Sequence, residues 1–211
     1  MHTTHRTTRL TVRSLVVAAA LGAIPVTTTL AAPATATTTA ATTATTTATS
    51  TATTGAVTAP YCGIAWGSLA KSNRTMAAGP VTGVRSGRHT CYDRLVVDLK
   101  GKPAGYTVKY VTNVYTEGQG KLVPLRGGAK LLVVVNAPAY SPNGSAAFTP
   151  RNPREVVDVT GYTTFRQVAW AGTFEGYTSM GLGVRARLPF RVFRLDDGTT
   201  SRLVIDVAHR W

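Results

Sequence analysis

The chain has 211 residues and is strongly basic, with 23 Lys and Arg against nine Asp and Glu and a net charge of +14. All of the acidic residues and both cysteines lie between Tyr61 and Trp211, a stretch of about 150 residues with room for one domain rather than several. Outside a cell, such a charge favours polyanions such as teichoic acids, phosphorylated wall polymers, anionic lipids or nucleic acid, without choosing among them.

The first 36 residues have the pattern of a secretory signal peptide. Arg6, Arg9 and Arg13 precede an apolar stretch at residues 15–26, and alanines with signal-peptidase spacing follow. The apolar stretch is short for a bilayer span, and neither a lipid-attachment cysteine nor an adjacent arginine pair accompanies it. We expect Sec export and removal of residues 1–36 after one of these alanines, with an uncleaved membrane anchor as the alternative. Without its three arginines the chain has 20 basic and nine acidic residues, a net charge of +11.

Residues 37–60 are dominated by threonine and alanine and contain no charged or aromatic side chain. Such a composition cannot build a core and predicts a disordered linker, or stalk, in front of a folded domain at residues 61–211. The stalk is either a plain spacer or a carrier of O-linked sugars, and composition does not decide between them.

The two cysteines, Cys62 and Cys91, both belong to the predicted domain. In an exported protein a single disulfide is the expected outcome. Closing a loop of about 30 residues stabilises the fold by roughly 3.5 kcal/mol in the chain-entropy estimate. The bond would fix the segment after the stalk to a strand.

A pentapeptide occurs twice, as RLVVD at residues 94–98 and RLVID at residues 202–206. In each copy the apolar residues alternate with Arg and Asp, which predicts a strand with one face in the core and paired charge on the other. The copies are too far apart for a solenoid repeat of about 20–50 residues. We interpret them as corresponding strands in two halves of a sandwich.

No long amphipathic helix is evident, and the remaining pattern predicts an all-β domain. Further strands are expected at residues 106–115, 121–125, 131–135, 156–159, 167–170, 177–185 and 190–195. Strands 92–99 and 106–115 are expected to pair as a hairpin, and residues 196–198 to join the last two strands. Residues 63–87 are expected to form a short helix or loop, and residues 138–153 a long loop of the kind that carries function.

The predicted strand 177–185 has one face nearly bare of side chains, because Gly181 and Gly183 alternate with larger residues. A bare glycine face lets another part of the molecule approach closely. The approaching element is either another sheet or a covering loop, or else a ligand.

Together these motifs resemble the AMIN-like domain of secreted actinobacterial proteins, a relative of the AMIN domain of cell-wall amidases and type IV pilus secretins. The matching stretches are residues 62–68, 91–99, 161–168, 181–192 and 202–207. The resemblance covers essentially residues 61–211 and implies a single β-sandwich of two small sheets. Through the parent AMIN family it implies binding to peptidoglycan or localisation in the envelope. No amidase or secretin domain accompanies it, so the catalytic activity of those relatives is not implied, and neither are ligand residues.

Four arginines are candidate ligand-binding residues, because they share a basic stripe with aromatic side chains. They are Arg185, Arg187, Arg191 and Arg194. Such guanidinium groups can hold phosphates of teichoic acid or carboxylates of a wall peptide bidentately. The alternative is that they pair with aspartates on neighbouring strands, namely Asp93, Asp98, Asp158 and Asp206.

We expect no catalytic residue, metal or cofactor. His89 and His209 lack the spacing of metal ligands, and Ser179 is out of register for a nucleophile elbow. The remaining enzymatic alternative is a thiolate at Cys91, because residues 86–91 loosely resemble the cysteine motif of L,D-transpeptidases. A free thiol is needed for that chemistry, and Cys62 is an available disulfide partner.

The sequence therefore predicts an exported, non-catalytic, wall-associated module that binds peptidoglycan or an anionic wall polymer. The alternative is an interaction module for another envelope protein, met through residues 138–153 or an open sheet edge. We expect neither a nucleic-acid partner nor a transmembrane span in the mature chain.

Overall fold

A computed structural model describes residues 60–211, so the predicted signal peptide and, except for Pro60, the predicted linker lie outside the described residues. The described part contains one 3-10 turn and eleven strands. Their bounds are η1 Tyr61–Gly63, β1 Lys71–Asn73, β2 Val81–Arg88, β3 Tyr92–Lys100, β4 Tyr106–Val111, β5 Val114–Tyr115, β6 Leu122–Val123, β7 Ala129–Val135, β8 Phe165–Phe174, β9 Tyr177–Val184, β10 Phe190–Asp196 and β11 Thr200–Ala208.

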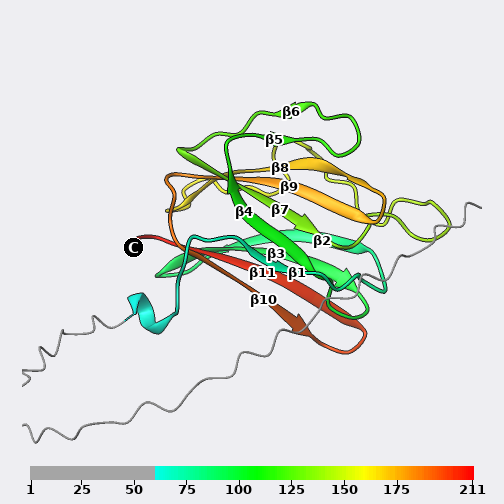
Figure 1. The fold of residues 1–211 in the computed structure, drawn as a ribbon, viewed down its shortest axis with the longest axis horizontal. Helices are drawn as coiled ribbons and strands as arrows, with labels where there is room; N and C mark the ends of the chain where they lie inside the picture. The colour runs from blue at the N-terminus through cyan, green and yellow to red at the C-terminus, as the bar shows by residue number, and fades with distance from the viewer. Residues whose placement is uncertain (1–59) are drawn as a thin grey trace, which may run out of the picture. The chain divides into compact units, whose positions relative to one another are not determined.

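Two antiparallel sheets pack face to face, as Figure 1 shows. One sheet has four strands in the order β10-β11-β3-β2, and the other has five in the order β1-β4-β7-β9-β8. A separate two-stranded ribbon, β5-β6, lies beyond the five-stranded sheet. The predicted all-β sandwich of two small sheets is therefore confirmed.

The core lies between the sheets and is built by the inward half of each alternating strand. Leu95 and Val97 of β3 face inward with Leu203 and Ile205 of β11, and each is at most 1% exposed. Removing such side chains from water is the main favourable contribution to folding, at roughly 1.5–3 kcal/mol for each large one. The run at residues 131–135 belongs to β7, the middle strand of the five-stranded sheet. Its odd-numbered residues are fully buried, and Leu132 packs, partly buried, on the opposite side.

The two pentapeptides are neighbours in one sheet. β3 and β11 pair antiparallel with Arg94 opposite Asp206, Val96 opposite Val204 and Asp98 opposite Arg202. Our interpretation of the copies as strands of two separate halves is wrong. Antiparallel pairing is favoured because it sets each arginine across from the aspartate of the other copy, which avoids facing like charges.

The predicted hairpin of strands 92–99 and 106–115 is also wrong. β3 belongs to the four-stranded sheet, whereas β4 pairs with β1 and β7 in the five-stranded sheet. The connection of residues 101–105 is long enough to cross the roughly 10 Å between packed sheets. Alternation identifies a strand but does not identify the sheet that it joins.

Two further expectations need correction. Residues 156–159 are not a strand: they belong to a loop along the edge of β8, where the Val156 N–H donates to the Val168 carbonyl. Residues 63–87 contain β1 and most of β2. In β2 a bulge between Val81 and Gly83, together with glycines at outward positions, hides the period-2 pattern.

A covering loop accounts for the bare glycine face of β9. A Cβ at Gly181 would lie 2.5 Å from Leu125 Cδ1, and one at Gly183 would lie 2.0 Å from the Arg126 carbonyl oxygen. Leu125 also joins a small second core that includes Val114 of β5. The outer side of the five-stranded sheet is therefore covered by the β5-β6 ribbon and its flanking loops.

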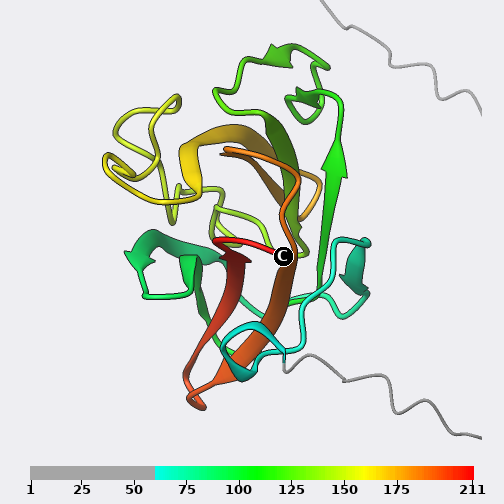
Figure 2. The same ribbon diagram turned by 90° about the vertical axis from the view of Figure 1, so that its left-hand side faces the viewer.

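The outer side of the four-stranded sheet has no comparable cover among residues 60–211. Figure 2 shows the leading segment, residues 61–70, running beside β10. This segment is held there by an antiparallel bridge between Gly67 and Phe190. Long side chains on this uncovered sheet face, such as Arg94 and Arg191, are partly exposed and accessible to a ligand.

The close approach at Gly183 predicts a large loss of stability in Gly183→Ala. The added methyl group would have to displace backbone, and we expect the free energy of unfolding to fall by about 1–3 kcal/mol. Gly87→Ala in β2 is the matched control, because its Cβ would meet only the His89 ring at 3.7 Å. Urea unfolding of both variants measures the difference; equal stabilities would contradict the backbone contact.

Candidate functional site

Strand register arranges the side chains of the uncovered sheet face in three rows across β10, β11, β3 and β2. The rows are Arg191, Asp206, Arg94 and Gly87; Phe193, Val204, Val96 and Arg85; and Leu195, Arg202, Asp98 and Gly83. Positive charge therefore surrounds an apolar centre. Two aspartates are interspersed among the four arginines.

Asp206 is the centre of an ion triad in the first row. Its carboxylate is fully buried and accepts hydrogen bonds from Arg94 Nε at 2.6 Å, Arg94 Nη2 at 2.9 Å and Arg191 Nε at 2.8 Å. The hydrogen bond to Asp206 is the main reason that the pKa of Arg94 is raised above its ordinary value. A buried carboxylate needs such partners, since an isolated charge in the interior costs several kcal/mol.

Three aromatic rings surround the two arginines of this triad. The Arg191 Cζ lies 5.0 Å from the Phe193 ring centroid, 5.4 Å from that of Tyr92 and 5.7 Å from that of Trp66. The Arg94 Cζ lies 5.2 Å from the Tyr92 centroid and 5.5 Å from that of Phe193. Each distance is within the range of a cation–π interaction. We call Trp66, Tyr92, Phe193, Arg94 and Arg191 the aromatic-arginine face.

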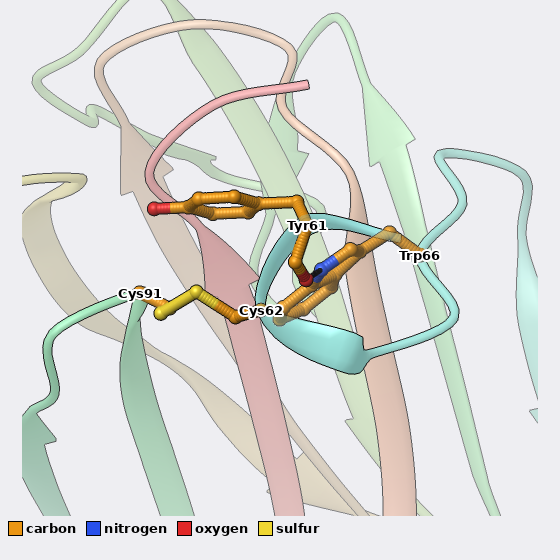
Figure 3. Close-up of a disulfide and its surroundings, with 4 residues drawn as sticks. All are labelled: Tyr61, Cys62, Trp66 and Cys91. Atoms are coloured by element: carbon orange, nitrogen blue, oxygen red, sulfur yellow. Dashed lines mark hydrogen bonds between the residues drawn. A yellow bond between two sulfur atoms is a disulfide. The ribbon is translucent and has the colours of Figure 1, made fainter. Parts of the chain in front are cut away.

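The leading segment brings Trp66 to this face. The predicted disulfide between Cys62 and Cys91 is confirmed, and it joins the segment to the residue before Tyr92 (Figure 3). The Trp66 indole N–H donates to the Tyr61 carbonyl at 2.8 Å, and its ring centroid lies 6.0 Å from that of Tyr92. The disulfide therefore positions an aromatic side chain of the face as well as closing a loop.

A hollow of about 250 Å³ lies beside the aromatic-arginine face. Its lining includes Val96 and Val204 together with Arg85, Arg94 and Arg202. The Arg202 Nε is buried and, among the described residues, has no hydrogen-bond partner. The hollow is bordered mainly by guanidinium groups, because Val96 and Val204 beneath them are almost fully buried.

Of the four predicted arginines, only Arg191 belongs to this face. Arg194 lies on the opposite face of β10, 3.5 Å from Asn73 Oδ1. β9 ends before Arg185 and β10 begins after Arg187, so these two lie in the connection and share no strand with Arg191. The predicted basic stripe is therefore divided among three places.

The alternative expectation was that the four predicted arginines pair with aspartates, and only Arg191 does so. Arg187 stacks on Tyr110 at 4.7 Å and Arg185 donates to the His209 carbonyl. Asp206 is the partner of Arg191, and the other three predicted aspartates have different contacts: Asp98 pairs with Arg85, Asp93 with His209, and Asp158 accepts from the Thr160 N–H.

Sequence reasoning missed most of the aromatic-arginine face. The outward Arg and Asp of the repeated pentapeptide were a usable signal for Arg94 and Asp206. Trp66 and Tyr92 gave none, because only the disulfide and the strand register bring their rings to Arg191.

Other reactive side chains have structural contacts. The buried Asp93 accepts backbone N–H groups of Thr164 and Phe165 and lies 3.2 Å from His209 Nε2. The sulfur of Cys91, which a thiolate enzyme would need free, is bonded to Cys62. No group of three or more His, Cys, Asp or Glu side chains comes together as a candidate metal site within residues 60–211.

The AMIN-like domain family matches residues 79–209, from just before β2 to the residue after β11. The chain belongs to the AMIN-like family. This match covers more than half of the chain and leaves Cys62 and Trp66 outside it. No curated protein and no solved structure matches. Membership of the AMIN-like family suggests an extracytoplasmic module associated with the wall or envelope. Within residues 60–211, no helix has the length and hydropathy to cross a bilayer.

The ion triad predicts unequal effects of two isosteric substitutions. Asp206→Asn removes the charge that Arg94 and Arg191 share, and we expect a loss of about 3 kcal/mol in the free energy of unfolding. Asp98→Asn is the matched control and should lose under about 1 kcal/mol, because its partner Arg85 is 56% exposed. Denaturant unfolding of both variants measures the contrast, and equal losses would rule out a buried triad.

Proposed function

We propose that this AMIN-like protein is an exported, non-catalytic module that binds peptidoglycan or an anionic wall polymer with its aromatic-arginine face. The observation that supports the proposal is the alternation of three rings with two guanidinium groups on the uncovered sheet. Rings of this kind pack against the apolar face of a sugar, while arginines donate to carboxylates or phosphates. A wall glycan with acidic substituents presents both features along one strand.

The arginines of this face keep donors for a ligand. Arg191 donates its Nε–H to Asp206. Its other N–H groups donate to no acceptor among residues 60–211. Aspartate pairing holds the guanidinium planes in place, so that a ligand need not order them at an entropic cost. The net positive charge of the domain adds long-range attraction to anionic polymers.

We propose in the same way that residues 1–36 are the leader that directs export. The disulfide is consistent with an oxidising compartment outside the cytoplasm. Removal of the leader would leave the stalk and the domain.

Phe193→Ala is expected to weaken retention on purified peptidoglycan by about tenfold, as for a central aromatic residue of an interface. Phe174→Ala is the matched control, since Phe174 is 48% exposed and lies at the end of β8, away from this face. Co-sedimentation of the purified protein at several salt concentrations measures retention, which should fall as salt screens the arginines. Absence of retention even at low salt would rule out wall binding.

Loss of the disulfide should lower both stability and binding. The double variant Cys62→Ser with Cys91→Ser is expected to lose about 3.5 kcal/mol from the free energy of unfolding. Its wall retention should fall to the level of Trp66→Ala in the oxidised protein, because Trp66 is no longer held beside Tyr92. Thiol titration of the denatured, unreduced parent protein should find no free thiol; two thiols would refute the bond.

Another envelope protein is a second candidate partner. One observation favours it: an apolar hollow of about 560 Å³ at the start of the 138–153 loop, whose lining includes Ala77, Pro80, Pro138 and Tyr140. Cross-linking in intact cells separates the two candidates. A specific protein adduct without wall retention would favour this partner over the glycan.

A further inference from the structure

A separate groove of about 600 Å³ lies where the end of β4, the start of β7 and the β9–β10 connection meet. Its lining consists of residues 110–112 at the end of β4, residues 127–130 at the start of β7, and Arg187 in the connection from β9 to β10. None of these residues belongs to the aromatic-arginine face.

Two cations line this groove, and neutral groups hold both of them. Arg187 stacks on the Tyr110 ring and its Nη2 lies 3.4 Å from the Ser68 carbonyl oxygen. The Lys130 ammonium donates to the Thr112 carbonyl at 3.1 Å and to Asn113 Oδ1 at 3.4 Å. The Ser68 carbonyl is the one hydrogen-bond acceptor that Arg187 has among residues 60–211, so the other N–H groups of its guanidinium are available to a ligand.

No carboxylate lines the groove. Among residues 60–211, neither Arg187 nor Lys130 lies within 4.0 Å of an acidic side chain. The four arginines of the uncovered sheet face differ, because each has an aspartate partner. The groove therefore holds two positive charges that no internal carboxylate offsets.

The surroundings of Arg187 and Lys130 are rigid. Tyr110 donates to the Leu188 carbonyl at 2.6 Å, accepts from the Leu188 N–H at 3.0 Å, and packs edge-on against Phe190. Burial raises the pKa of Tyr110 to about 12, so the phenol stays protonated and keeps this bond well into the alkaline range. Gly127 has a φ of +115°, and a Cβ there would lie 2.4 Å from the Val184 carbonyl oxygen. The turn before Lys130 is thus fixed against the end of β9.

We propose that this groove is an anion-binding site in which Arg187 and Lys130 together hold one phosphate group of a ligand. A tetrahedral phosphate presents oxygens in several directions, which suits two cations that approach from different elements better than a planar carboxylate does. The groove leaves room for the remainder of a phosphate ester. This site does not depend on what the aromatic-arginine face binds.

An NMR titration of the purified protein tests the site, with glycerol 3-phosphate and acetate as probes at constant ionic strength. We expect glycerol 3-phosphate to cause saturable shifts of the Gly127, Gly128 and Arg187 amides, with a dissociation constant in the millimolar range. Arg187→Gln and Lys130→Gln should each weaken binding at least about fivefold. Arg194→Gln removes the same charge from an exposed position outside the groove and should change affinity less than about twofold.

Three results would overturn the proposal. They are shifts that do not saturate, equal weakening by Arg194→Gln, and acetate binding as tight as that of glycerol 3-phosphate. Dispersed spectra of the Gln variants confirm that they fold. The titration uses small anions and no peptidoglycan. It therefore tests the groove separately from wall binding by the aromatic-arginine face.

Discussion

The antiparallel register of β3 and β11 is the constraint on which the rest of the structure depends. Opposing Val96 to Val204 places Leu95 and Ile205 together in the core and sets Arg94 against Asp206 on the outside. A slip of one residue would exchange the two faces and bury the charges. The same register is nearly symmetric about the pair Val96 and Val204: on one side Arg94 faces Asp206, and on the other side Arg202 faces Asp98. The adjacent strands make the two sides different. Arg191 of β10 joins the ion pair of Asp206 and Arg94, whereas Arg85 of β2 binds Asp98.

This constraint separates two kinds of positive surface. On the sheet face the register supplies an aspartate for the arginines, so the guanidinium groups are oriented and largely neutralised, and the aromatic rings provide the apolar contact area. In the groove, Arg187 and Lys130 are held by a ring and by carbonyl groups, so their charge is not offset. A sugar-rich segment with acidic substituents suits the first surface, because the rings provide stacking area and the oriented arginines provide hydrogen-bond donors at short range. A phosphate suits the second, because Coulomb attraction is strongest where no internal carboxylate competes.

Sequence alone was sufficient for the fold class, for most of β3, β7, β9, β10 and β11, for the middle of β8, and for the disulfide, because these depend on local alternation and on the number of cysteines. It was insufficient for sheet membership: β4 has the same alternation whether it pairs with β3 or crosses to β7. The candidate site was found only in part. Arg191 was identified, and the repeated pentapeptide indicated outward charge at Arg94. Trp66 reaches Arg191 only because a disulfide holds its segment, and the pairing of Arg94 with a partner 112 residues along the chain depends on strand register, which local sequence does not give. Arg187 was identified for its charge, whereas its separation from Arg191 depends on where β9 ends.

The leading segment links the two surfaces. Trp66 packs beside Arg191 on the sheet face, and two residues later the Ser68 carbonyl accepts from Arg187 in the groove. Between them Gly67 pairs with Phe190, the first residue of β10. Because the AMIN-like family match begins at residue 79, the contribution of this segment does not follow from family membership. A polymer that carries both sugars and phosphates would meet the two surfaces on either side of residues 66–68, so the disulfide that holds the segment would influence both contacts.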